Sequence, residues 1–287
     1  MRPPNRRHRP CAALTAPASA ARRRTGEPNP TSWPTISSHF GVIDLAGFEK
    51  AGAAYYRAWW RGQQDVVYVF PHWTRPATDI GKPVAVNVYA NASSCELLVN
   101  GASQGAKAMP PLGFLRWANV AYAPGNATVE CRDAAGSLVG TGVTATAGPP
   151  ARLEISVDAG ANGVAGDGAD VALVRVTVLD ARGVLVPTVA GFAPAPAGAP
   201  PEVLVSFSVG GDGDVYGVAN GDPADHGADK FTSSRRAFGG LVRLVARAHD
   251  LGGSAGAMNI TARAPGLAPV HVVVPVLAAA GSAQRRP

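Results

Sequence analysis

The sequence predicts a mainly β protein with two immunoglobulin-like antiparallel β-sandwiches in tandem. From residue 65 onward, apolar residues recur at every second position, which is the period of a half-buried strand. Glycine and proline number 34 and 25 in 287 residues; both are poor inside helices and natural in the turns of an all-β chain. The length allows about two domains at roughly 150 residues each.

The segment at 31–61 is the exception to this β pattern. It starts with a polar loop and an apolar run that carries one acid, and residues 49–61 then predict a helix of roughly three turns, ended by Gly62. Four aromatic side chains at three- and four-residue spacing give this helix a broad apolar face: Tyr55, Tyr56, Trp59 and Trp60. We expect that face to pack on the body of the protein; a stacking platform for sugar is the alternative.

Seven short strands are expected in a first domain at 64–147, a spacing typical of an immunoglobulin-like sandwich. Asn100-Gly101 is the strongest hairpin signal in the chain. The expected strands cover residues 66–70, 83–89, 95–99, 102–109, 114–122, 127–132 and 138–146.

A second domain is expected at 148–278, after a boundary that Pro149 and Pro150 stiffen. A small-residue stretch at 190–201 predicts a surface loop, and residues 279–287 predict a disordered tail. The expected strands cover residues 152–157, 171–180, 203–209, 214–218, 234–238, 241–248, 258–264 and 270–277.

Positive charge is concentrated in residues 1–24, which contain seven arginines and no acid. The remaining 19 basic residues face all 20 acids, so the folded part is nearly neutral and no nucleic-acid partner is expected. The basic start is interpreted as a disordered tail, an organelle transit peptide, or a start codon placed inside a longer gene. We favour the last. No stretch reaches the ~18 apolar residues of a membrane span.

Cysteine usage and glycosylation motifs say little about function. Cys95 and Cys131 lie on strands of one domain and could pair, but two buried free thiols are the expectation. With Cys11 they form no zinc-binding pattern. Acceptor sequons for N-glycosylation occur at Asn91, Asn126 and Asn259. Together with the arginine-rich start, they favour a secreted or organellar protein.

General catalytic motifs are absent: no nucleophile elbow, phosphate-binding loop, zinc protease motif or dinucleotide fingerprint is found. Arg235-Arg236 could clamp an anion, although a solvated strand edge is the expectation. Five aspartates close in sequence could suggest a cation loop, but their spacing is that of ordinary turns, and no metal or other cofactor is expected. They are Asp212, Asp214, Asp222, Asp225 and Asp229.

Several motifs, in one order along residues 25–264, resemble glycoside hydrolase family 2, the β-galactosidase group. Residues 26–30 and 33–50 resemble the closing loop and last helix of its catalytic barrel. Phe70-Pro71-His72-Trp73 and residues 95–105 resemble its next sandwich, and residues 147–150 its domain boundary. Residues 205–209, 217–223 and 235–238 resemble its C-terminal sandwich. The resemblance implies that residues 25–63 are the remnant of a (β/α)8, or TIM, barrel.

Family 2 enzymes are retaining glycosidases that need two glutamates about 5–5.5 Å apart. The resemblance places both on earlier barrel strands, so no catalytic residue is expected here and the chain alone should be inactive. Glu27 and Trp33 would lie on the loop face of the barrel as substrate-binding residues, or serve only for loop rigidity and packing. The expected partner is a β-galactoside or related carbohydrate, and a homo-oligomer is possible.

Two other interpretations remain open. The chain could be a non-catalytic carbohydrate-binding, adhesion or spacer module, which would not need residues 37–50. It could also be a pseudogene product of poor solubility, because the peptide 31–62 would expose aromatic side chains. Those side chains are Phe40, Phe48, Tyr55, Trp59 and Trp60.

Overall fold

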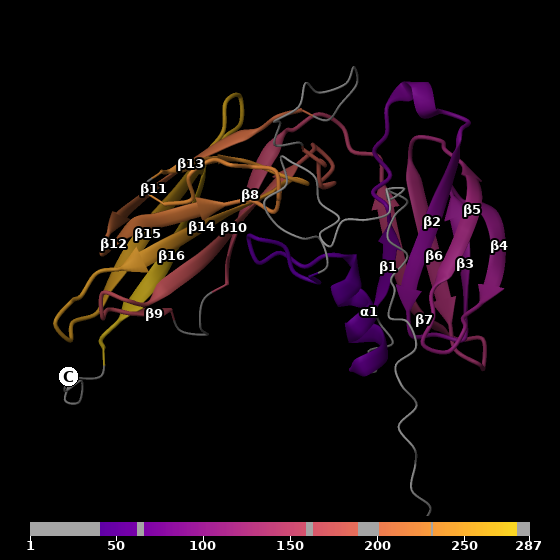
Figure 1. Cartoon of the computed structure of the whole chain (residues 1–287), viewed down its shortest axis with the longest axis horizontal. Helices are drawn as coiled ribbons and strands as arrows, with labels where there is room; N and C mark the ends of the chain where they lie inside the picture. The colour runs from indigo at the N-terminus through magenta and orange to yellow at the C-terminus, as the bar shows by residue number, and fades with distance from the viewer. Residues whose placement is uncertain (1–40, 62–65, 159–162, 189–200, 231, 280–287) are drawn as a thin grey trace, which may run out of the picture.

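The computed structural model describes residues 41–61, 66–158, 163–188, 201–230 and 232–279, and these ranges are mainly β. Figure 1 shows two β-sandwiches with one helix, α1 (Ala51–Trp60), between them. The tail predicted at 1–24, residues 190–200 of the predicted insertion and residues 280–287 lie outside the described residues. The helix predicted at 49–61 is confirmed, one or two residues shorter at each end.

The first sandwich has a three-stranded and a four-stranded antiparallel sheet. The seven strands predicted at 64–147 are confirmed, and the Asn100-Gly101 turn has both residues at positive φ, +50° and +83°, as a tight hairpin requires. The sheets are β1 (Val67–Phe70), β2 (Pro83–Ala90) and β5 (Leu115–Ala121), and β4 (Ala102–Ala108), β3 (Ser94–Val99), β6 (Asn126–Arg132) and β7 (Leu138–Ala145).

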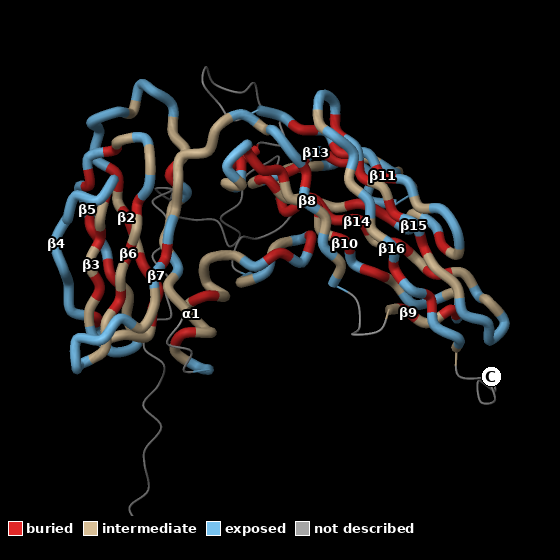
Figure 2. The backbone as a smooth tube through the Cα atoms, turned by 180° about the vertical axis from the view of Figure 1, so that it is seen from behind, coloured by how far each residue is buried: buried red, intermediate tan, exposed pale blue. Residues whose placement is uncertain are grey.

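Alternation along these strands sends apolar side chains between the two sheets, where Figure 2 shows the buried positions. Val86, Leu97 and Val129 are fully buried there. Trp73, just after β1, closes one end of the core: its indole Nε1 donates to the Ala123 carbonyl at 2.9 Å. The Phe-Pro-His-Trp motif therefore ends in a packing residue.

The expectation of two free thiols is wrong, because Cys95 and Cys131 form a disulfide. The register pairs them directly across β3 and β6, with Cα atoms 4.0 Å apart. Both side chains point into the core, so their sulfur atoms meet. Sequence spacing could not supply that register.

The second sandwich pairs a four-stranded sheet with a five-stranded sheet. All predicted strands at 152–277 are confirmed; the two-residue strand β9, which pairs parallel to β16, and the short 3-10 helix at Ala77–Asp79 were not predicted. The sheets are β12 (Gly213–Ala219), β14 (Leu241–Ala248), β10 (Val171–Leu179) and β8 (Arg152–Asp158), and β13 (Ser234–Arg236), β11 (Leu204–Gly211), β15 (Gly256–Arg263), β16 (Val270–Leu277) and β9 (Val164–Ala165).

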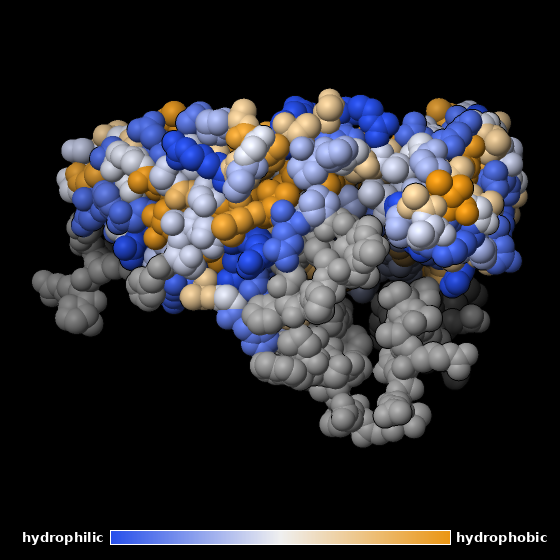
Figure 3. Space-filling view, turned by 90° about the horizontal axis from the view of Figure 1, so that it is seen from above, coloured by the Kyte–Doolittle hydropathy of each residue, from blue (hydrophilic) through white to orange (hydrophobic). Residues whose placement is uncertain are grey.

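Each sandwich has its own apolar core, the first from residues 73–131 and the second from residues 153–276. Figure 3, viewed from above, shows polar and apolar atoms interspersed over the surface, with the largest apolar group near the middle. The domain limits at 64, 148 and 278 and the immunoglobulin-like connectivity stay predictions. Among the residues that the structure describes, no helix is long and apolar enough to cross a membrane.

The linker between the sandwiches is fixed by Asp180, whose side chain is buried. Its Oδ2 accepts from the Gly148 amide, and its Oδ1 accepts from the Arg182 and Val184 amides, all at 2.8 Å. Burial would raise the pKa of this carboxyl, but these hydrogen bonds to its charged form outweigh burial and lower the pKa to about 2. An ionised aspartate thus ties the linker to the second sandwich.

Candidate functional site: a hairpin docked between the sandwiches

Residues 42–50 form a tight hairpin, called here the docking hairpin. The amide of Lys50 donates to the Val42 carbonyl, and the amide of Asp44 donates to the Phe48 carbonyl. Asp44 closes the tip, because its Oδ1 accepts from the Ala46 and Phe48 amides at 2.9 and 2.8 Å. Gly47, at φ +80°, supplies the left-handed turn. The shape of the hairpin tip at residues 44–48 is therefore determined by residues within the tip itself.

The hairpin tip packs on the outer face of the sheet β12-β14-β10-β8. Phe48 is 3% exposed, under the guanidinium groups of Arg243 and Arg175 at 4.5 and 5.5 Å from its ring centre. Arg243 Nε donates to the Ala46 carbonyl at 3.1 Å, and its Nη1 pairs with Asp158 at 2.7 Å. Arg243 is itself buried, so β14 presents a desolvated cation to the hairpin.

The exposure expected for Phe48 is therefore wrong. In the peptide 31–62 this ring lacks a partner, whereas in the folded chain the second sandwich covers it. The structure leaves Tyr55 and Trp59 half-buried and Trp60 69% exposed, and Phe40 lies outside the described residues.

Asp44 also touches the loop after β12. A Cβ placed on Gly221 would lie 2.0 Å from Asp44 Oδ2, so only glycine allows this approach. The two oxygens of Asp44 thus have different neighbours: Oδ1 shapes the hairpin, and Oδ2 lies against the second sandwich.

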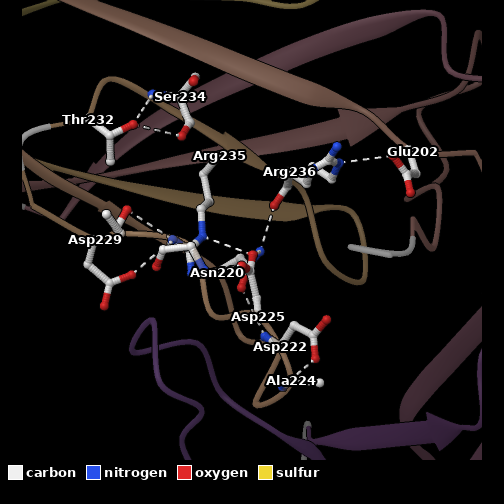
Figure 4. A network of polar contacts seen from close by, with 12 residues as sticks. Glu202, Asn220, Asp222, Ala224, Asp225, Asp229, Thr232, Ser234, Arg235 and Arg236 are labelled. Atoms are coloured by element: carbon white, nitrogen blue, oxygen red, sulfur yellow. Dashed lines mark hydrogen bonds and ion pairs between the residues drawn. The ribbon is translucent and has the colours of Figure 1, made fainter. Parts of the chain in front are cut away.

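A polar network holds that loop in place, as Figure 4 shows. Asn220 Nδ2 donates to Asp225 Oδ2 at 2.7 Å and to the Arg236 carbonyl at 2.9 Å. Arg235 is buried, 3.0 Å from Asp225 and 3.2 Å from Asp229, and donates to the carbonyls of residues 227 and 228. The Arg235 guanidinium is thus engaged by two carboxylates and two carbonyls, which hold the turn at 222–229 against β13.

The solvated strand edge expected for Arg235-Arg236 is thus wrong for Arg235, although Arg236 is exposed and pairs with Glu202. Its buried position follows from the turn at 222–229, which brings two carboxylates beside it. Among the described residues, His, Cys, Asp and Glu do not gather in any group of three or more that could hold a metal ion.

Helix α1 packs on the first sandwich. Tyr55 Oη donates to the Leu112 carbonyl at 2.6 Å, and Trp59 Nε1 donates to the Gly113 carbonyl at 3.1 Å. The Tyr55 ring meets Tyr89 of β2 edge-on at 5.4 Å. The predicted packing role of these aromatics is confirmed, but Ala54 and Ala58 are the buried residues of the helix and Trp60 points to solvent.

The predicted substrate-binding residues Glu27 and Trp33 lie outside the described residues, so their role stays a prediction. The structure instead brings together Asp44, Phe48, Gly221 and Arg243, and sequence reasoning gave the last no role. Arginine at an outward position of an apolar strand is a common pattern, so the contact with Ala46, 197 residues away, could not be inferred.

Comparison with known proteins places the chain in a family. The description "Glycoside hydrolase family 2 C-terminal domain 5" matches residues 155–273, and "Domain of unknown function (DUF4982)" matches residues 81–140. The β-galactosidase BoGH2A of Bacteroides ovatus is 36% identical over 245 residues, which is 84% of this chain and 26% of that protein. The chain corresponds to the C-terminal portion of glycoside hydrolase family 2 proteins.

A second curated relative agrees with this assignment, and a solved structure shares the fold. A putative β-glucuronidase of Formosa agariphila is 30% identical over 216 residues, which is 72% of this chain and 19% of that protein. A solved β-glycosidase from Bacteroides vulgatus has the same fold, with a TM-score of 0.71, 24% identity, and coverage of 85% of this chain and 29% of that one. The chain thus spans about a quarter or less of the curated relatives named here.

Proposed function

We propose that this chain is the C-terminal part of a retaining glycoside hydrolase of β-galactosidase type, which acts on terminal β-glycosides in carbohydrate metabolism. In this proposal, residues 25–63 complete the catalytic barrel and the two sandwiches hold that end in place. The observation that carries it is the docking of Phe48 and Ala46 on Arg243 of the second sandwich, while α1 packs on the first.

This geometry suits a support for a neighbouring catalytic unit. The hairpin and helix are held from both sides by buried contacts, so a barrel that ends in them would be fixed relative to both sandwiches. A free adhesion or spacer module would have no neighbouring catalytic unit for the docked hairpin and helix to position.

The chemistry itself would come from elsewhere in the parent enzyme. Double displacement needs one glutamate as nucleophile and a second as acid and base. The carboxylates near the hairpin are engaged in ion pairs or turns: Asp158 with Arg243, Asp225 with Arg235, and Asp44 with backbone amides. We therefore propose that the isolated chain has no glycosidase activity.

A chimera tests the proposal directly. This chain would replace the matching C-terminal part of the B. ovatus β-galactosidase, with which it is 36% identical. We expect the chimera to hydrolyse a nitrophenyl β-galactoside. Arg243→Ala should lower that activity, whereas Arg247→Ala, on the same strand but away from the hairpin, should not. A folded but inactive chimera would contradict the proposal.

The isolated chain gives the second measurement. Purified and assayed with the same nitrophenyl glycoside, it should release no nitrophenol above a blank. Turnover that copurifies with the chain and survives removal of host glycosidases would contradict the proposal that both catalytic glutamates lie outside this chain.

A further inference from the structure

We propose that Asn259 is an N-glycosylation site and that its glycan covers the outer face of the five-stranded sheet. Asn259-Ile260-Thr261 lies within β15. The strand alternates, so Ile260 is buried in the core while the Asn259 side chain is exposed on the outer face. The acceptor amide therefore points to solvent from the middle of a sheet.

The two cross-strand neighbours of Asn259 leave room for a sugar. On one side it pairs with Gly210 of β11, where an added Cβ would meet no atom within 4 Å. On the other side it pairs with Val273 of β16, which is 60% exposed. The acceptor Nδ2 leans toward β11, 3.3 Å from where a Cβ on Gly211 would stand, so a first N-acetylglucosamine would extend over the glycines of that strand.

The outer face around the sequon is exposed to solvent and mixes apolar with polar side chains. Val273 of β16 is 60% exposed, and the Thr261 hydroxyl of the sequon is hydrogen-bonded to His271 Nδ1 at 2.9 Å. This face lies on the opposite side of the sandwich from the sheet that holds the docking hairpin. A glycan at Asn259 would therefore leave the Arg243 contacts undisturbed.

The disulfide is an independent observation that agrees with this assignment. Disulfides form and persist in oxidising compartments, which include the endoplasmic reticulum where N-glycans are attached. Cys95 and Cys131 are joined in the first sandwich, far along the chain from Asn259. The other sequons differ in setting: Asn91 is half-buried, and the backbone amide of Asn126 is bound by Asn100 at the end of a hairpin.

The test is a glycopeptide measurement on the full chain secreted from a eukaryotic host. Trypsin releases residues 248–263, which contain Asn259 as their only asparagine. Removal of the glycan by an amidase in ¹⁸O-water should leave labelled aspartate at this position. Asn259→Gln should lower the intact mass by one glycan. A secreted chain whose 248–263 peptide is found only unlabelled would overturn the proposal.

A second pair of variants guards against misfolding of Asn259→Gln. Thr261→Ala keeps the asparagine but destroys the sequon and should remove the label, whereas Thr261→Ser keeps the hydroxyl and should retain it. Label that persists in Thr261→Ala would also count against the site. The same peptide from the cells that naturally make the chain should carry the label, and its absence there would refute the assignment.

Discussion

Asp44 and Gly221 illustrate how a single residue can join distant parts of this molecule. The carboxylate of Asp44 closes its own hairpin through two backbone amides, and its other oxygen rests where a side chain at Gly221 would stand. Asp44 lies in the docking hairpin, whereas Gly221 lies in the loop after β12 of the second sandwich. Their contact depends on shape, because the Asp44 oxygen occupies the space that a side chain at position 221 would need.

Gly221→Ala should therefore weaken the docking of the hairpin. The new methyl would lie 2.0 Å from Asp44 Oδ2, and relieving that overlap should cost about 1–3 kcal/mol in the free energy of unfolding. Urea denaturation measures the loss. Gly210→Ala is the control, since its Cβ meets nothing within 4 Å and no loss is expected. Equal stability of the two variants would contradict this account.

Arg243→Ala should release the hairpin from the second sandwich. It removes the hydrogen bond to Ala46, the ion pair with Asp158 and the cation over Phe48. A loss of about 2 kcal/mol would speed local amide exchange about 30-fold. Hydrogen exchange at the Asp44 and Lys50 amides, both bonded within the hairpin, reports the change.

Arg247→Ala is the matched control for that experiment. Arg247 is four residues further along β14 and contacts the Tyr216 ring instead of the hairpin. Exchange at Asp44 and Lys50 should stay at the wild-type rate in this variant. If both variants gave the same exchange rate, Arg243 would have no special part in docking.

At the scale of elements, the linker at Gly148 depends on the ionisation of Asp180. Its carboxyl has a pKa of about 2 when folded and near 3.8 when unfolded, so its stabilising effect is complete above about pH 4 and is lost as the pH falls toward 2. Asp180→Asn should lower stability at neutral pH and flatten the acid dependence in this window. Thermal unfolding between pH 2 and 5 measures both.

Asp133→Asn provides the comparison for the linker variant. Asp133 also accepts two backbone hydrogen bonds in a turn, from Ala135 and Ser137, but it lies within the first sandwich. Its substitution leaves the hydrogen bonds of the Gly148 linker in place, so it reports what the loss of a turn carboxylate alone costs at neutral pH. An Asp180→Asn curve parallel to the wild-type curve would refute the linker role.

The disulfide between β3 and β6 should make stability sensitive to reductant. It closes a loop with a sequence separation of 36, for which the chain-entropy estimate is about 3–4 kcal/mol. Guanidinium denaturation with and without reductant should show this drop for the wild type and for Cys11→Ser. The denaturation midpoint of Cys131→Ser should be low both with and without reductant. A wild-type denaturation midpoint that is the same with and without reductant would contradict the presence of the disulfide.

The strands were predictable because alternation and turn chemistry are local signals. The first sandwich illustrates the limit: the Asn100-Gly101 turn was clear from the sequence, but the pairing of Cys95 with Cys131 depends on the neighbouring strand. Burial of Arg235 and Arg243 depends on partners that arrive from other segments. The site was missed because such contacts leave no periodic pattern.

For the whole molecule, the segment 41–61 is covered on two sides and open on the rest. Ile43 and Leu45 are each 53% exposed and Trp60 is 69% exposed, although Phe48 and Ala58 of the same segment are buried. In the proposed enzyme, the remainder of the barrel would cover this open side. In the isolated chain these large apolar side chains stay exposed to solvent.

We therefore expect the isolated chain to self-associate through this surface. The double variant Leu45→Ser with Trp60→Ser should lower the mass-average molecular weight measured by light scattering at high protein concentration. Ile80→Ser with Val143→Ser is the control, since both residues are equally exposed but lie on the first sandwich. A monodisperse wild-type chain would contradict the expectation.

The bond from Arg243 to Ala46 also has a consequence during synthesis. Its partners are 197 residues apart, so at about 5–20 residues per second the ribosome needs roughly 10–40 seconds to deliver β14 after the hairpin has emerged. During that interval Phe48 lacks the nearer of the two guanidinium groups that cover it in the folded chain. Docking of the hairpin on Arg243 therefore cannot be completed before β14 has been synthesised.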